Sequence, residues 1–132
     1  MIAYQETKIF TVEEIRRLFL SVGWESGQYP EKIVRGLRHS TAVISAWDGD
    51  KLVGLVRGLD DGETVGFIHY LLVDPAYQGN HIGQELMQRI LEAYRHLLYV
   101  KIMPSDPKTV PFYEKFGFKV YDNYCAMEIK RL

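Results

Sequence analysis

The segment DPAYQGNHIG, from Asp74 to Gly83, has the residue types and spacing of a ligand-binding loop. It follows the apolar run TVGFIHYLLV and opens a segment with helical periodicity. The first backbone N–H groups of a helix have no partner within it, and the helix dipole adds partial positive charge there. Gly79 and Gly83 would let a ligand approach these groups, and no acidic residue lies between Gln78 and Gly83. The pattern predicts either an anion site, for which diphosphate is the usual ligand, or a structural turn with incidental glycines.

Two common nucleotide-binding loops do not fit this segment. A P-loop needs a Lys-Ser/Thr pair after its second glycine, whereas Gly83 is followed by Gln84 and Glu85. A dinucleotide-binding loop needs three glycines and an acidic residue about 20 residues later. Only two glycines are present, and the later run YVKIM ends without an acid. Both nucleotide-binding patterns therefore fail for this segment.

QGNHIG resembles the diphosphate loop of the GNAT acyltransferase superfamily, Gln/Arg-x-x-Gly-x-Gly/Ala, and matches it at Gln78 and Gly83. It departs at His81, where the family usually has glycine, and a Cβ there narrows the loop. The segment VPFYEKFGF, residues 110–118, resembles a later helix and turn of the same family. The two matches have the expected order and separation.

Two details resemble the arylalkylamine N-acetyltransferases within that superfamily. VPFYEKFGF is similar to their version of the motif, including Pro111. His69 lies nine residues before Gln78, at the offset of the histidine proposed as a base in those enzymes.

The resemblance implies acetyl-CoA as the donor and an amine as the acceptor. It also implies a splayed central strand, whose backbone at Leu71, Leu72 and Val73 pairs with the pantetheine arm of CoA. Tyr113 would stand near the CoA sulfur. The diphosphate would be held by Gln78, Gly79, Asn80, His81, Ile82, Gly83 and Gln84.

The chemistry of acetyl transfer assigns roles to two side chains. The acceptor amine must be neutral, because an ammonium has no lone pair, so a base is needed near neutral pH. The imidazole of His69, with an unperturbed pKa of about 6.5, is the first candidate, although a strand histidine bonded to a carbonyl is the alternative. The phenol of Tyr113 can give a proton to the departing thiolate, or else Tyr113 only packs against the sheet. The backbone N–H near Val73 is the expected oxyanion donor.

The part of the site that binds the acceptor amine is expected around residues 24–29. Trp24, Tyr29 and Trp47 could form an aromatic floor for an amine, or they could be ordinary core aromatics. An acidic groove would favour polyamine or lysine acceptors, and an apolar aromatic pocket would favour arylalkylamines. The sequence does not choose between them.

Periodicity and cap residues predict the elements that position these groups. The expected helices follow Thr11, where Glu14 completes a capping box, then begin at Pro30, at Ile82 (continuing to about Leu97) and after Asp106. The expected strands are IAYQETK, TAVISAW, KLVGLVRGL, TVGFIHYLLV, LLYVKIM, FKVYD and CAMEIK, the last two as a closing pair. This order predicts an α/β (mixed α+β) fold: a mixed, mostly antiparallel sheet with a splayed central strand and about four helices.

Composition limits the class of protein. The 132 residues suit one domain, and with the resemblance this implies a single GNAT acetyltransferase domain over residues 1–132. A net charge of −1 gives no basic excess for nucleic acid or a membrane surface, and no apolar run is long enough to span a bilayer. Cys125 stands alone, which rules out an internal disulfide, and we expect a cytoplasmic protein with no metal. Cys125 itself is expected to be a small buried hydrophobe.

The function expected from these observations is direct acetyl transfer from acetyl-CoA to a primary amine of a small molecule. Two alternatives stay open. One is a non-catalytic acyl-CoA-binding or regulatory module, which is suggested by the departure from the family loop pattern at His81. The other is a protein acetyltransferase acting on lysine or an N-terminus. A homodimer is the assembly considered, although the sequence does not determine the oligomeric state.

Overall fold

Five strands form one sheet in sequence order, β1-β2-β3-β4-β5, in the computed structural model, which describes residues 1–132. The first three pairings are antiparallel, and β4 pairs with β5 in parallel. The predicted mixed, mostly antiparallel sheet is therefore confirmed. The strands are β1 (Ile2–Gln5), β2 (Ala42–Asp48), β3 (Lys51–Asp60), β4 (Val65–Val73) and β5 (Tyr99–Ile102).

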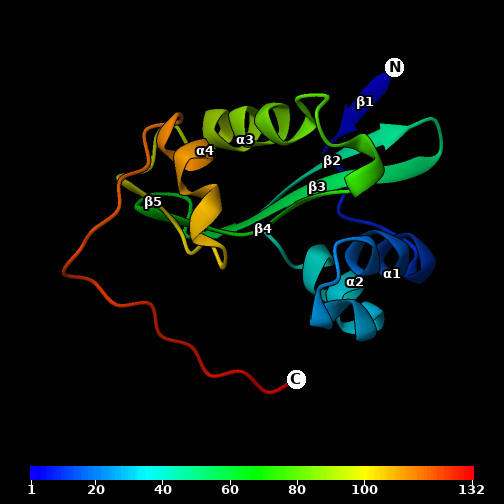
Figure 1. The fold of residues 1–132 in the computed structure, drawn as a ribbon, viewed down its shortest axis with the longest axis horizontal. Helices are drawn as coiled ribbons and strands as arrows, with labels where there is room; N and C mark the ends of the chain where they lie inside the picture. Colours follow the sequence, from blue (N-terminus) through cyan, green and yellow to red (C-terminus); the bar gives the residue numbers. More distant parts are fainter.

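Helices cover both faces of the sheet, as Figure 1 shows: α1 and α2 lie on one face, and α3 lies on the other with α4 near its end. The helices are α1 (Val12–Ser21), α2 (Pro30–Arg38), α3 (Ile82–Ala93) and α4 (Val110–Glu114). Short 3₁₀ turns span Glu25–Gln28, Pro75–Tyr77 and Pro107–Thr109. The four predicted helices are confirmed, although α3 ends at Ala93, one turn before the predicted Leu97. No helix has the length and apolar character needed to cross a membrane.

The helix starts follow from local sequence. The side chain of Thr11 accepts a hydrogen bond from the Glu14 backbone N–H, and the Glu14 carboxylate accepts one from the Thr11 N–H, which completes the predicted capping box. Pro30 occupies the first turn of α2, where its missing N–H costs nothing.

Two hydrophobic cores, one on each face, hold the three layers together. Leu52 and Leu55 of β3 pack with the buried faces of α1 and α2, whereas Val53 and Val56 pack with α3. Gly54 lets α3 approach closely, because a Cβ at this position would lie 3.2 Å from side-chain carbons of Ile82 and Leu86. The sheet is thus fixed from both sides, and the start of α3 is fixed against it.

Strand β4 is paired on both sides along only half of its length. It pairs with β5 from Val65 to Ile68 and with β3 from Gly66 to Val73. The register with β3 shifts where Arg57 opposes Tyr70 and Gly58 opposes Ile68, so His69 is an extra, bulged residue. From this bulge to Val73 the strand has no neighbour on the β5 side. The predicted splayed central strand is confirmed.

The predicted closing strand pair, FKVYD and CAMEIK, is wrong. Residues 118–132 contain no strand and run away from the sheet as an extended chain (Figure 1). Alternating apolar residues satisfy a strand pattern, but a strand forms only where a neighbour supplies backbone partners, and this segment has none. Cys125, expected to be buried, is exposed on the same segment.

Candidate active site

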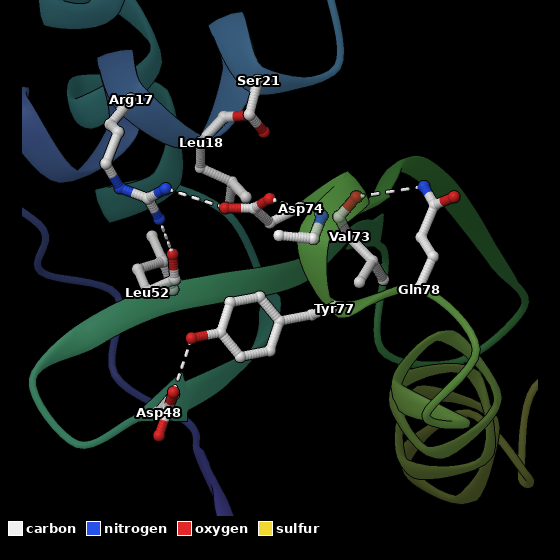
Figure 2. A network of polar contacts seen from close by, with 10 residues as sticks. Arg17, Leu18, Ser21, Asp48, Leu52, Val73, Asp74, Tyr77 and Gln78 are labelled. Carbon is white, nitrogen blue, oxygen red and sulfur yellow. Dashed lines mark hydrogen bonds and ion pairs between the residues drawn. The ribbon is translucent and has the colours of Figure 1, made fainter.

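The loop between β4 and α3 is anchored through Asp74. The Asp74 carboxylate accepts a hydrogen bond from the Ala76 N–H at 2.9 Å and pairs with Arg17 of α1 at 2.8 Å. Arg17 also donates to the carbonyl oxygen of Leu52 (Figure 2). Burial by itself would raise the pKa of Asp74, but the hydrogen bonds from Arg17 and Ala76 outweigh it and lower the pKa below its usual value. The carboxylate therefore fixes the loop and does not face a ligand.

Two further contacts set the course of the loop (Figure 2). The hydroxyl of Tyr77 donates to the carboxylate of Asp48, the last residue of β2. The Gln78 side-chain amide donates to the backbone carbonyl of Val73 at 3.3 Å. Gln78, which the sequence places in the diphosphate loop, thus lies against the open part of β4.

The start of α3 has the geometry of an anion site. Gly79 has φ +89°, and His81, the N-cap residue, lies in the left-handed region at φ 60° and ψ 19°. No side chain caps the first N–H groups of α3. A Cβ at Gly83 would come no closer than 3.8 Å to Phe112 and Val73, so this face of the helix is uncrowded. Uncapped N–H groups beside open space suit a phosphate.

The open edge of β4 leads directly to that helix start. The Asp74 N–H donates to the carbonyl of Val53 on β3 at 2.8 Å, so strand alternation turns the N–H and carbonyl of Val73 to the open side. Leu71 has the same orientation, whereas Leu72 directs its backbone to β3 and buries its side chain. Of the three predicted arm-binding residues, Leu71 and Val73 turn backbone groups to the open side, where the Val73 carbonyl accepts from Gln78.

His69 lies in a cluster with Arg57 and Tyr70 that the bulge brings to one side of β4. The His69 and Tyr70 rings are 4.3 Å apart, and the Arg57 guanidinium lies 4.4 Å from the Tyr70 ring centroid. Arg57 Nη2 lies 2.6 Å from His69 Nδ1. Burial and the charge of Arg57 lower the pKa of His69, and Glu128 partly opposes them. The imidazole is therefore neutral at pH 7, with Nδ1 accepting from Arg57 and the proton on Nε2.

A cavity of about 290 Å³ adjoins this cluster, between α2 and the middle of the sheet. Its walls include Tyr29, Lys32, Gly36, Arg57 and Tyr70. The predicted acceptor region is thus hollow.

The three aromatic residues predicted for the acceptor floor separate in the structure. Tyr29 lines the cavity. Trp24 packs edge-on against Phe19, and Trp47 stacks on Phe10 in the core. Arg57 was not singled out from the sequence, although a charge inside the apolar run KLVGLVRGL is an unusual signal that could have found it.

Tyr113 lies on α4, partly buried beside α3. Its ring contacts Phe112 and Phe118 edge-on, at centroid distances of 5.2 and 6.1 Å. Burial raises the pKa of Tyr113, so the phenol stays protonated at neutral pH. A second cavity of about 220 Å³ separates α3 from α4, with Gln84 and Lys115 in its walls.

His, Cys, Asp and Glu side chains nowhere gather in a group of three that could hold a metal ion. The sequence expectation of no metal stays a prediction, and so does the cytoplasmic location.

Comparison with known proteins identifies the class. The model of the acetyltransferase (GNAT) family matches residues 9–118. The GNAT protein SP0256 from Streptococcus pneumoniae TIGR4 superposes with a TM-score of 0.84, at 32% identity over 100% of both chains. Protein SA2161 from methicillin-resistant Staphylococcus aureus superposes with a TM-score of 0.86, at 28% identity over 99% of this chain and 100% of that one. The chain belongs to the GNAT acetyltransferase family, which confirms the predicted superfamily, fold and acyltransferase class.

Relatives found by sequence differ in how much of their length aligns with this chain. The glucosamine 6-phosphate N-acetyltransferase of Trypanosoma brucei brucei is 35% identical over 69 residues, which cover 52% of this chain and 47% of that enzyme. A ycf52-like N-acetyltransferase of Prochlorococcus marinus is 25% identical over 93% of this chain and 72% of its own length. The chain thus matches about half the length of the trypanosomal enzyme. The narrower resemblance to arylalkylamine N-acetyltransferases stays a prediction.

Proposed function

We propose that residues 1–132 form one acetyltransferase domain that moves an acetyl group from acetyl-CoA directly to the primary amine of a small molecule. The observation that carries the proposal is the continuity of two features: the open edge of β4 ends at the uncapped start of α3. One elongated ligand with a polar arm and a diphosphate could contact both. Family membership and the names of the relatives support acetyl transfer.

The residues present suit acetyl-CoA, which would supply an activated thioester. The proposed diphosphate contacts are the backbone groups of residues 78–84. The proposed contacts of the pantetheine arm are the backbone groups of Leu71 and Val73, with the Val73 N–H directed toward the thioester oxygen. Gln78 would leave the Val73 carbonyl as the arm takes its place. The cavity beside Gln84 and Lys115 is the proposed region for the remaining nucleotide.

Two side chains are proposed to transfer protons during the reaction. Tyr113 holds a proton on its hydroxyl at neutral pH and can donate it to the departing sulfur. His69 is unprotonated at the same pH and is the proposed acceptor of the amine proton. Because its Nδ1 lone pair already accepts from Arg57, proton uptake at Nδ1 requires the guanidinium to move away.

A panel of amines tests the proposal, with free thiol released from acetyl-CoA as the readout. Transfer to at least one small primary amine is expected. Binding of acetyl-CoA is measured separately from the rise in melting temperature, and a hundredfold excess over Kd should add about 2.7 kcal/mol to the free energy of unfolding. Binding without transfer would favour a non-catalytic module, transfer to peptides alone would favour a protein acetyltransferase, and no binding would refute the proposal.

We also propose a homodimer formed through residues 119–129. Val120, Met127 and Ile129 on this segment are exposed to 60%, 87% and 77%. Strand β5 is an open edge, because β4 is its only neighbour. The segment does not cover its own β5: it runs to the cavity beside α2, where Arg131 and Leu132 lie. An unpaired apolar segment and an open edge in one chain suit pairing between two copies.

A further inference from the structure

Arg57 differs from the other buried charged side chain of this protein. Arg57 and Asp74 are exposed to only 8% and 6%. Asp74 is paired with Arg17, whereas no ion pair in the structure includes Arg57. A buried guanidinium without a counter-ion is unfavourable unless something offsets its lost hydration.

The neutral neighbours of Arg57 satisfy only part of its hydrogen-bonding capacity. Nη1 donates to the Ser40 hydroxyl at 3.0 Å, Nη2 contacts His69, and the guanidinium stacks on Tyr70. Nε is buried and has no hydrogen-bond partner. A guanidinium has five N–H donors in a planar arrangement that matches a carboxylate or phosphate. Arg57 therefore offers charged donors that the protein satisfies only in part. No acidic side chain forms an ion pair with it, and the carboxylate of Glu128 acts on this cluster only through the charge it exerts on His69.

The cavity beside α2 gives a ligand access to this donor set. Arg57 lines it together with Lys32 and Arg131, and no Asp or Glu side chain contributes to its walls. Glycine within a helix is unfavourable, yet α2 has Gly36 in this wall. A Cβ there would lie 3.9 Å from Arg57 Nη1, so the glycine keeps the space beside the guanidinium open. The side chains that line the cavity thus include basic groups and no acidic one, and the cavity volume suits a small molecule.

We propose that this cavity binds the acceptor through an anionic group, a carboxylate or a phosphate, held by Arg57. The acceptor is then a small primary amine that also carries negative charge. This inference rests on the proposed function, because it names the acceptor class of that reaction. His69 lies 2.6 Å from Arg57, so one small molecule can contact the guanidinium and reach the proposed base. Polyamines are disfavoured, because Arg57 and Lys32 repel a second cationic group.

Pairs of amines that differ in an anionic group show how much that group contributes to acetyl transfer. Butylamine is compared with 4-aminobutyrate, and ethanolamine with phosphoethanolamine, each with acetyl-CoA; putrescine serves as the cationic member. A charged hydrogen bond predicts at least about a tenfold higher kcat/KM for the anionic member of one pair. The carboxylate and phosphate pairs also show which anion is preferred. Equal or better transfer to the neutral amines or to putrescine would overturn the inference.

Variants on α2 and β3 supply the matched controls. Arg57→Gln should reduce the preference for the anionic amine to within about threefold. Lys32→Gln should weaken it partially, whereas Arg35→Gln removes an exposed charge from the same helix outside the cavity and should leave it unchanged. If Arg57→Gln does not fold, Gly36→Ala, which narrows the cavity beside the guanidinium, should selectively raise KM for the anionic amine. A preference that survives these changes would overturn the assignment to Arg57.

A binding experiment that needs no turnover separates this inference from the reaction. With CoA present in saturating amount to occupy the start of α3, inorganic phosphate or acetate is added at constant ionic strength. A rise in melting temperature is expected for the wild type and for Arg35→Gln, a smaller rise for Lys32→Gln, and none for Arg57→Gln. Such a rise without any acetyl transfer would refute the reaction and retain the anion site. Acetyl transfer without any such rise would retain the reaction and refute the anion site.

Discussion

Tyr113 and His69 have opposite proton requirements in the proposed reaction, and their surroundings shift their pKa values in the matching directions. Burial raises the pKa of the Tyr113 phenol, which must hold a proton. Burial and Arg57 lower the pKa of the His69 imidazole, which must be free of one. A proton donor and a proton acceptor are thus each held in the required form at neutral pH.

The first prediction concerns the hydroxyl of Tyr113. Tyr113→Phe keeps the ring and its contacts with Phe112 and Phe118, so the melting temperature should change little. If the hydroxyl protonates the departing sulfur, kcat should fall by about 10²–10⁴. The Kd for acetyl-CoA should stay within about threefold, because the lost interaction belongs to the transition state. Both constants are measured with the best amine of the panel.

The pH profile provides an additional check on Tyr113. Since the pKa of the phenol is raised, the wild-type rate should decline only at high pH, as the phenol ionises, and this decline should be lost in Tyr113→Phe. An unchanged kcat would reduce Tyr113 to a packing residue. A parallel loss of donor binding and rate would make it a binding residue.

The start of α3 can be tested with a substitution that is favourable for the helix. Gly83→Ala places a methyl group at an ordinary contact distance from its neighbours and replaces glycine within a helix. The free energy of unfolding should rise by up to about 1 kcal/mol. The same methyl group lies where the diphosphate is expected, so the Kd for acetyl-CoA should rise at least about tenfold. Thermal unfolding and calorimetric titration measure the two effects.

His81→Gly is the matched counterpart in the same loop. Because His81 has a positive φ, which costs an L-residue about 1–2 kcal/mol, glycine should adopt this backbone conformation more readily. Stability and donor binding should be equal or improved. A large loss of binding would show that the imidazole itself contacts phosphate, and unchanged binding in Gly83→Ala would place the diphosphate elsewhere.

Asp74 connects this loop to α1 and β3, which makes the element sensitive to acid. The pKa of the folded carboxyl is lowered, so its stabilising effect is complete above the unfolded pKa of about 3.9 and is lost as pH falls through the folded pKa. Asp74→Asn should reduce the free energy of unfolding at pH 7 by about 1–3 kcal/mol and weaken its decline below pH 4. Urea unfolding from pH 7 to pH 3 measures this. Glu13→Gln removes an exposed ion pair and should change neither quantity much.

Elements with local signals were predictable from the sequence, whereas those that depend on distant partners were not. The capping box at Thr11 and Glu14 gave the start of α1, because both hydrogen bonds lie within one turn. The strand pattern of CAMEIK did not establish a strand, since pairing depends on a neighbour that no local pattern contains. The charge of Arg57 is visible in the sequence, but its place beside His69 depends on a bulge between two strands.

The site shows the same division. The loop residues 78–83 were predictable as a unit, because glycines and helix periodicity occur together in a short stretch. From the sequence, Trp47 and Tyr29 were equally good candidates for the aromatic floor of the acceptor site. Only the packing of Trp47 on Phe10 separates a core residue from one that lines the cavity.

At the scale of the whole molecule, the proposed homodimer predicts a measurable mass. Light scattering during gel filtration should give the mass of two chains for the wild type. Ile129→Asp places a charge on the exposed apolar segment and should shift the mass to one chain, while Lys119→Gln on the same segment should not. A wild-type mass of one chain would refute the homodimer.

The half-paired state of β4 has a consequence for the exchange of its amide hydrogens with solvent. The amide of Asp74, bonded to Val53 on β3, should exchange slowly, whereas those of Leu71 and Val73 face the open side and should exchange much faster. Neighbouring amides at the end of β4 and in the residue after it would thus differ in protection. Acetyl-CoA bound along this edge should slow Leu71 and Val73 selectively and leave Asp74 unchanged. Nuclear magnetic resonance of the free and bound protein would resolve the alternation residue by residue, and a uniform response along the strand would indicate that the donor does not pair with this edge.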